Sequence, residues 1–172
     1  LYPESEIYAF EPDKITFEKL KKNVLQNKLK NVYLFNNAIT DKNGKIDYFV
    51  DLKSPGYLLM STIQERIPKD KVTVNCISLS SLIKEKKIPQ IDFVKMDIEG
   101  QEATAILSTK KDTWANVEMI LEVGTEKNAK IIFEYLNEIN VNMFSQKTGW
   151  NKVSDLAEIP TSYKEGSLFL SV

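Results

Sequence analysis

Apolar residues recur along the chain in short runs separated by longer amphipathic stretches. Short apolar runs bounded by Pro, Gly, Asn or Asp are typical of strands, and apolar positions three and four residues apart are typical of helices. The pattern predicts strands at 7–10, 31–35, 45–50, 72–77, 91–96, 117–123, 141–145 and 167–172. It predicts a helix that follows Asp13 as its N-cap and runs to about residue 27, helices at 78–87 and 100–108, and a helix capped by Thr125.

Strands that alternate with amphipathic helices predict an α/β fold with a Rossmann-like, doubly wound and mostly parallel sheet covered on both faces. The strand at 91–96 has the apolar character of a fully buried strand, Phe93 included. The strands at 45–50 and 72–77 are expected to pair antiparallel, and the last two strands predict an antiparallel C-terminal edge. We expect residues 1–172 to form a single domain, because no repeat or linker interrupts the pattern.

Composition narrows the possible chemistry. The 172 residues are 42% hydrophobic and carry 23 basic and 24 acidic side chains, so no nucleic-acid or membrane partner is indicated. The one cysteine, Cys76, excludes an intrachain disulfide and suits a reducing, cytoplasmic compartment; we expect neither a membrane span nor a signal peptide. The absence of histidine removes Ser-His-Asp catalysis and His-containing zinc sites. Any catalysis would therefore depend on carboxylates, lysines, hydroxyls or a bound cofactor.

Acidic residues stand at the ends of three of the predicted strands. They are Glu11, Asp97 and Glu122, and the strand at 31–35 is followed by the pair Asn36 and Asn37. Because ligands of open α/β sheets bind outside the carboxyl ends of the strands, these polar side chains predict a binding site at that edge. For Glu99 and Glu102 a helix-capping role and a functional role remain equally open.

Four segments, in this order and spacing, carry a family resemblance: IYAFEPD, NNAITDKNGKIDYFV, IDFVKMDIEGQE and MILEVG. They resemble the FkbM-type methyltransferases, closely over residues 7–123 and loosely beyond. The resemblance implies a class I enzyme that uses S-adenosylmethionine to methylate a hydroxyl group on a sugar, a polyketide-type small molecule or a glycan. The family's first strand and Gly-rich loop, which precede IYAFEPD, have no counterpart here, so the domain is expected to be partial.

The resemblance also implies roles for individual residues. Glu11, followed by Pro12, would bind the ribose hydroxyls of the cofactor. Asn37 would make a polar contact beside the adenine and Ala38 would pack against it. Asp97 would lie near the methionine end of the cofactor and the acceptor hydroxyl, and Glu99 belongs to the same motif.

The reaction needs a group that manages the acceptor's proton. Asp97 is the preferred candidate, and Glu99, Lys95, Tyr57 and Glu122 are the others. We expect no metal, although an alternative in which Asp97 and Glu99 supply oxygen ligands to Mg²⁺ stays open. The irregular stretch 51–71 is expected to form part of the acceptor wall or to be a surface loop.

Two other functions compete with the methyltransferase. One is a catalytically inactive methyltransferase-like domain that serves as a binding or scaffold module. The other is a nucleotide- or NAD-binding Rossmann-like domain, in which an acid after the second strand also binds ribose. The sequence does not specify the acceptor or the oligomeric state.

Overall fold

The computed structural model describes residues 4–50, 58–59, 70–98, 100–114 and 116–171. The chain divides into two compact units, Leu1–Ile77 and Ser78–Val172. Each unit combines helices with β-sheet, so the α/β class predicted from the hydrophobic pattern is confirmed.

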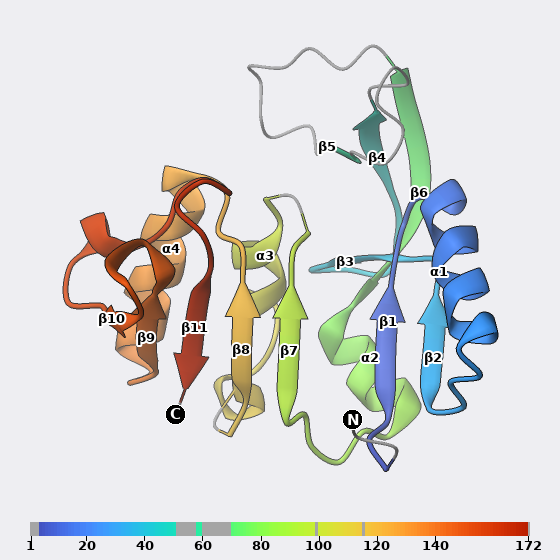
Figure 1. The fold of residues 1–172 in the computed structure, drawn as a ribbon, viewed down its shortest axis with the longest axis horizontal. Coiled ribbons are helices and arrows are strands. Elements are labelled where there is room, and N and C mark those ends of the chain that lie inside the picture. Colours follow the sequence, from blue (N-terminus) through green and yellow to red (C-terminus); the bar gives the residue numbers. More distant parts are fainter. Residues whose placement is uncertain (1–3, 51–57, 60–69, 99, 115, 172) are drawn as a thin grey trace. The chain divides into compact units, whose positions relative to one another are not determined.

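Among its described residues the first unit has one helix and two sheets. In chain order its elements are β1 (Ile7–Phe10), α1 (Lys14–Gln26), β2 (Val32–Phe35), β3 (Ala38–Thr40), β4 (Gly44–Val50), β5 (Leu58–Leu59) and β6 (Asp70–Ser78), whose last residue begins the second unit (Figure 1). All four strands that the sequence predicted in this unit are present, whereas the short strands β3 and β5 were not predicted.

Strands β1 and β2 lie parallel, and the helix α1 connects them. The helix begins after Asp13, whose Oδ1 accepts a hydrogen bond from the Thr16 N–H at 2.8 Å, as expected of an N-cap. The rings of Phe10 and Phe35, paired in the register, stack with centroids 4.8 Å apart. These contacts hold the chain firmly on both sides of Glu11, which lies between β1 and α1.

The other sheet of the first unit has the order β3-β6-β4-β5. Strands β4 and β6 pair antiparallel, with Ile46 opposite Val74, as predicted from their sequence pattern. Ala38, Val74 and Cys76 form a buried cluster against which Ile46 packs. The three residues of β3 are all buried, so this short strand is held by packing that no local sequence signal reports.

The second unit contains three α-helices and one five-stranded sheet among its described residues. Its elements are α2 (Leu79–Lys86), β7 (Phe93–Met96), α3 (Glu102–Leu107), the 3₁₀ helix η1 (Lys111–Trp114), β8 (Glu118–Leu121), α4 (Glu126–Glu138), β9 (Asn142–Ser145), η2 (Gln146–Thr148), β10 (Asn151–Lys152), η3 (Leu156–Glu158) and β11 (Leu168–Ser171).

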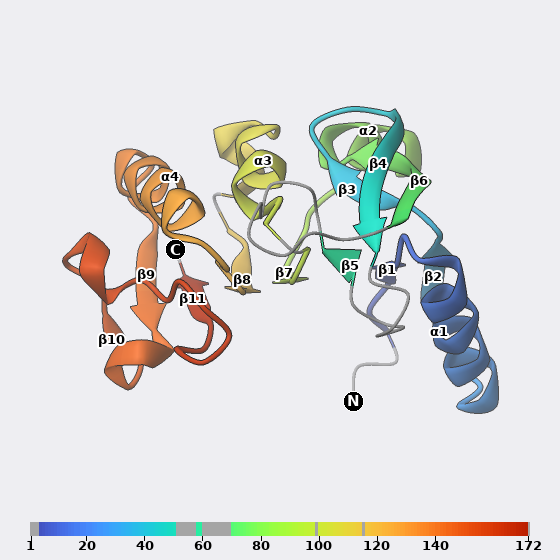
Figure 2. The ribbon, with the colours of Figure 1, turned by 90° about the horizontal axis from the view of Figure 1, so that it is seen from above.

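The sheet of this unit is mixed, with the order β10-β9-β11-β8-β7. Strands β7 and β8 run parallel, whereas β11 pairs antiparallel with both β8 and β9. The closing strands are therefore antiparallel, as the sequence predicted. Helices α3 and α4 contact each other and lie on the same side of the sheet (Figure 2).

The strand β7 is buried on one face only. Met96 is 4% exposed, and its partner Leu121 in β8 is buried, as is Met119, which pairs with Val94. All three lie on the face that α3 and α4 cover. Phe93 points to the opposite face and is 55% exposed, so the expectation that this strand is buried on both sides is wrong. The alternation of side chains along a strand places Lys95 on the same open face as Phe93.

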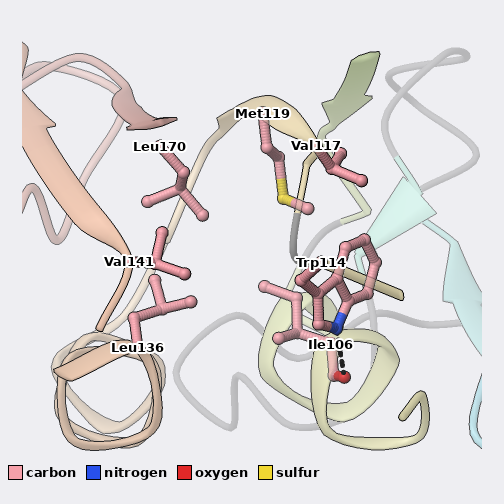
Figure 3. A pocket seen from close by; sticks show the side chains of 7 residues that line it. All are labelled: Ile106, Trp114, Val117, Met119, Leu136, Val141 and Leu170. Atoms are coloured by element: carbon pink, nitrogen blue, oxygen red, sulfur yellow. Dashed lines mark hydrogen bonds between the residues drawn. The ribbon is translucent and has the colours of Figure 1, made fainter. Parts of the chain in front are cut away.

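The core of the second unit forms where the helices meet the sheet. The Trp114 indole N–H donates a hydrogen bond to the Ile106 carbonyl at 3.2 Å, and both side chains are buried (Figure 3). Together with Met119, Leu136 and Leu170 they surround a cavity of about 10 Å³, no larger than one water molecule needs. This tightly packed core gives the sheet edge beside it a rigid base.

The N-cap of α4 provides a first test of the fold. Thr125 Oγ1 accepts a hydrogen bond from the Asn128 N–H at 3.1 Å, as the sequence predicted for this residue. Replacing Thr125 with alanine should lower the free energy of unfolding by about 1 kcal/mol, measured by urea denaturation. Thr125→Ser, which keeps the hydroxyl, should retain most of that stability, and equal losses in the two variants would contradict the capping role.

Candidate functional site

Glu11 directly follows β1 and is held in place by its neighbours. Its backbone N–H donates to the Phe35 carbonyl at 3.1 Å, which extends the pairing of β1 with β2 by one residue. Its Oε1 accepts a hydrogen bond from the Asp13 N–H at 2.8 Å, and partial burial raises the pKa of this carboxyl. Within the described residues Oε2 has no hydrogen-bond partner, so it is available to a ligand.

A second polar residue holds this loop. Asn36, the first residue after β2, donates through Nδ2 to the carbonyls of Glu11 at 2.8 Å and Pro12 at 3.0 Å. The side chain therefore joins the ends of the two parallel strands, and its role is to position the Glu11 backbone. Sequence reasoning named the Asn36–Asn37 pair, but it assigned a role only to Asn37, which is half-buried beside it.

Ala38 lies in the hydrophobic cluster of the first unit. It is 2% exposed and packs with Val74, Cys76 and Ile46. The side chain thus has a packing role that the sequence did not indicate, and its proposed contact with an adenine ring stays a prediction.

In the second unit three charged side chains meet at the carboxyl ends of β7 and β8. Lys95 Nζ lies 3.8 Å from Asp97 Oδ2 and 3.7 Å from Glu122 Oε1. The Glu122 N–H donates to the Met96 carbonyl at 3.0 Å, so the parallel pairing of β7 and β8 brings the two acids to the same end of the sheet. Lys95 and Asp97 are two residues apart and lie on the same face, and the structure adds Glu122 to them.

The three groups are open to solvent. The side chains of Asp97 and Glu122 are 46% and 37% exposed, and that of Lys95 is 52% exposed. Ion pairs of this exposure contribute little to stability. A structural role therefore explains the arrangement poorly, while a ligand can reach both carboxylates.

Glu102 is buried below this edge and is only 1% exposed. Its Oε1 accepts hydrogen bonds from the Ile98 N–H at 3.0 Å and the Gly100 N–H at 3.3 Å, and its Oε2 accepts one from Asn128 Nδ2 at 3.0 Å. Burial raises the pKa of Glu102, although the N–H donors oppose this shift. The residue therefore holds the turn after β7, which follows Asp97, against the first turn of α4.

The predicted site residues are divided between the two units. Glu11, Pro12, Asn37 and Ala38 belong to the first unit and Asp97 belongs to the second. Glu99, Tyr57 and most of the stretch 51–71 lie outside the described residues.

The described residues show neither a metal-binding cluster nor a membrane-spanning helix. In the part of the chain that the structure describes, which leaves out Glu99, there is no group of three or more Asp, Glu, Cys or His residues placed to hold a metal ion. None of the helices described is long and apolar enough to cross a bilayer.

Comparisons with known proteins place the chain in a family. The model of the methyltransferase FkbM domain matches residues 2–151. The crystal structure of methyltransferase FkbM from Methylobacillus flagellatus KT is similar, with a TM-score of 0.57 and 12% sequence identity over 96% of this chain. This chain spans 36% of that protein's length. A search of curated proteins found no match. With most of its length matched by the FkbM domain, the chain belongs to the FkbM methyltransferase family.

Proposed function

We propose that the protein is an S-adenosylmethionine-dependent O-methyltransferase that acts on a hydroxyl of a sugar, a polyketide-type small molecule or a glycan. The observation that carries the proposal is the exposed Asp97 at the carboxyl end of β7, inside the motif that carries the family resemblance. The proposal includes a Rossmann-like, doubly wound arrangement of the complete catalytic domain, since ligands of such sheets bind at this edge. It also includes a cytoplasmic location, which the single cysteine favours.

The first unit supplies the residues proposed to hold the cofactor. S-adenosylmethionine would contribute a methyl group on a positively charged sulfur. Glu11 Oε2, which has no hydrogen-bond partner among the described residues, would accept hydrogen bonds from ribose hydroxyls, while the Asp13 N–H holds Oε1. Asn37, after β2, offers an amide for an adenine contact. These residue types fit the cofactor, and the fixed backbone around Glu11 reduces the entropy lost on binding.

The second unit supplies the residue proposed to receive the proton. A carboxylate oxygen of Asp97 accepts the proton of the acceptor hydroxyl as the hydroxyl oxygen becomes the nucleophile. Lys95 lies between Asp97 and Glu122. Its positive charge offsets the repulsion between the two carboxylates and helps to orient the Asp97 side chain. Glu99 is kept as a second candidate in the same motif.

The cofactor role of Glu11 is tested by isothermal titration of the protein with S-adenosylmethionine. Glu11→Gln should raise the dissociation constant about tenfold, because a charged acceptor of two hydroxyls is replaced by a neutral one. Glu18→Gln, an exposed acid on α1, is the matched control and should leave the constant unchanged. NAD serves as the competing ligand, and a protein that binds NAD but not S-adenosylmethionine would refute the proposed function.

A further inference from the structure

A polar cleft opens beside Glu122 in the second unit. Its volume of about 680 Å³ lies within the range of small-molecule sites, roughly 300–1,000 Å³. The side chains that line it come from the end of β8, from η2 and from the segment before β11; they include Glu122, Gln146, Lys147, Tyr163, Lys164 and Glu165. Apart from Glu122, none of these residues has a role in the proposed methyl transfer.

Internal contacts hold the walls of the cleft in place. The Lys147 Nζ pairs with Glu165 Oε1 at 3.0 Å, and Glu165 Oε2 accepts hydrogen bonds from the Thr161 N–H at 2.7 Å and the Thr161 hydroxyl at 3.0 Å. A second link between the same two segments is the bond in which Gln146 Oε1 accepts the Ser167 N–H at 2.9 Å. The wall therefore has a defined shape before any ligand arrives, which lowers the entropic cost of binding.

A glycine allows the close approach of these two segments. Gly166 has φ +93°, and a Cβ built there would lie 2.3 Å from Gln146 Oε1. Any other residue would collide with the glutamine and would also strain the backbone. The glycine thus lets the Gln146 side chain lie against the backbone of the segment before β11.

The cleft lies next to the proposed proton acceptor. Glu122, one of its lining residues, shares Lys95 with Asp97 through the two contacts of 3.7 and 3.8 Å. A ligand held in the cleft against Glu122 therefore presents its groups close to the Asp97 carboxylate. If Asp97 receives the acceptor's proton, the acceptor hydroxyl has to reach this carboxylate.

The lining chemistry identifies the class of ligand. The lysine and amide groups of the cleft donate hydrogen bonds, and its carboxylates accept them. A ring with several hydroxyls pairs with both, because each hydroxyl is a donor and an acceptor. An apolar ligand would leave these groups without partners. Glu122 and Glu165 balance Lys147 and Lys164, so no excess charge selects an anion.

One aromatic ring completes the cleft. Tyr163 is 76% exposed, and the Lys164 Nζ lies 5.9 Å from the centre of its ring. An exposed phenol ring offers a flat apolar surface to the C–H face of a pyranose and a hydroxyl to its edge. A ligand that covers the ring removes its apolar surface from water, which favours binding.

We propose that this cleft binds the neutral saccharide part of the methyl acceptor, with Tyr163 and Lys164 as its main affinity-determining residues. The inference rests on the proposed function and selects a saccharide among its acceptor classes. It also predicts that the methylated hydroxyl belongs to the bound sugar ring or to the unit attached to it, because the cleft adjoins Asp97 through Glu122 and Lys95.

Ligand-observed saturation-transfer NMR on the full chain tests the proposal without requiring turnover. The probes are the methyl pyranosides of glucose, mannose, galactose and rhamnose, with cyclohexanol and methyl glucuronide as the apolar and anionic comparisons. At least one neutral glycoside should bind more tightly than both comparisons. Tyr163→Ala and Lys164→Ala should each weaken its binding about fivefold to tenfold.

Matched controls are Trp150→Ala and Lys130→Ala. Both residues are exposed members of the same unit and neither lines the cleft, so binding should be unchanged. The proposal is wrong if no neutral glycoside binds, if cyclohexanol or the glucuronide binds better, or if the cleft variants bind like the controls.

The saccharide proposal and the proposed methyltransferase function can fail independently of each other. Glycoside binding that depends on Tyr163, in a protein that does not bind S-adenosylmethionine, would support the saccharide site and refute the methyltransferase. Methyl transfer to an acceptor that is insensitive to both cleft variants would support the methyltransferase and refute the saccharide site.

Discussion

Replacing Asp97 with asparagine should lower the rate of methyl transfer by about 10²–10⁴-fold, the range that a general base contributes. Asparagine has nearly the same shape as aspartate but cannot take up the hydroxyl proton. The effect is expected in kcat, because Asp97 is assigned to the proton and not to the binding of the cofactor ribose. Single-turnover transfer of a labelled methyl group measures it.

The other end of the same strand provides the control for this prediction. Asp92 lies before β7 and accepts a hydrogen bond from Gln90 Nε2 at 2.9 Å, so Asp92→Asn changes a carboxylate remote from the carboxyl end. It should leave turnover unchanged, and Asp97→Asn should retain S-adenosylmethionine affinity in isothermal titration. A fully active Asp97→Asn protein would remove Asp97 from the mechanism.

Replacing the buried Glu102 with alanine should lower the free energy of unfolding by about 3 kcal/mol. The change leaves the N–H groups of Ile98 and Gly100 without their acceptor in a buried place. It also removes one of the two acceptors of the Asn128 amide, whose Nδ2 keeps its bond to the Val123 carbonyl. The turn after Asp97 would lose its attachment to α4. Urea denaturation followed by circular dichroism measures the loss, and a variant as stable as the wild type would contradict the assigned role.

Glu102→Gln separates the charge of this residue from its shape. Because burial raises the pKa of Glu102 above its ordinary value of 4.5, the folded protein binds this proton more tightly than the unfolded chain does. The stabilisation is therefore complete below the ordinary value and is lost as the pH rises through the folded pKa. The glutamine does not titrate and lacks this dependence.

The expected result is a pH-dependent difference between the two proteins. Measured by urea denaturation from about pH 4 to pH 7, the stability of the wild type relative to Glu102→Gln should fall as the pH rises. Other carboxyls with shifted pKa values, such as Glu158 and Glu165, are common to both proteins and cancel in the difference. A constant difference, or one that rises with pH, would show that burial does not govern this carboxyl.

Much of the site was already visible in the order of residues. The caps at Asp13 and Thr125 were predicted because they depend on contacts three residues apart. Glu11 and Asp97 were placed correctly at strand ends, since strand boundaries follow from local hydrophobic pattern. The family motif gave these acids expected roles, a cofactor contact for Glu11 and proton transfer for Asp97. Both roles stay predictions.

Other features were beyond local reasoning. Phe93 was expected inside but is exposed, because its sequence pattern does not reveal which face the helices α3 and α4 cover. The sequence left a capping role and a functional role of Glu102 equally open. The hydrogen bond to Asn128, 26 residues later in the chain, shows its structural role, and only the tertiary structure reveals it. The strand β3 is too short for a periodic signal and depends on packing around Ala38.

The sequence by itself determined the succession of strands and helices, the helix caps and the acids that follow the strands, because these are set by neighbours along the chain. Only the tertiary structure decided that Lys95 lies between Asp97 and Glu122, and that a polar cleft adjoins them. The physical reason is that strand order and register bring together side chains from β7, β8 and the segment before β11, whose distances along the chain carry no local signal.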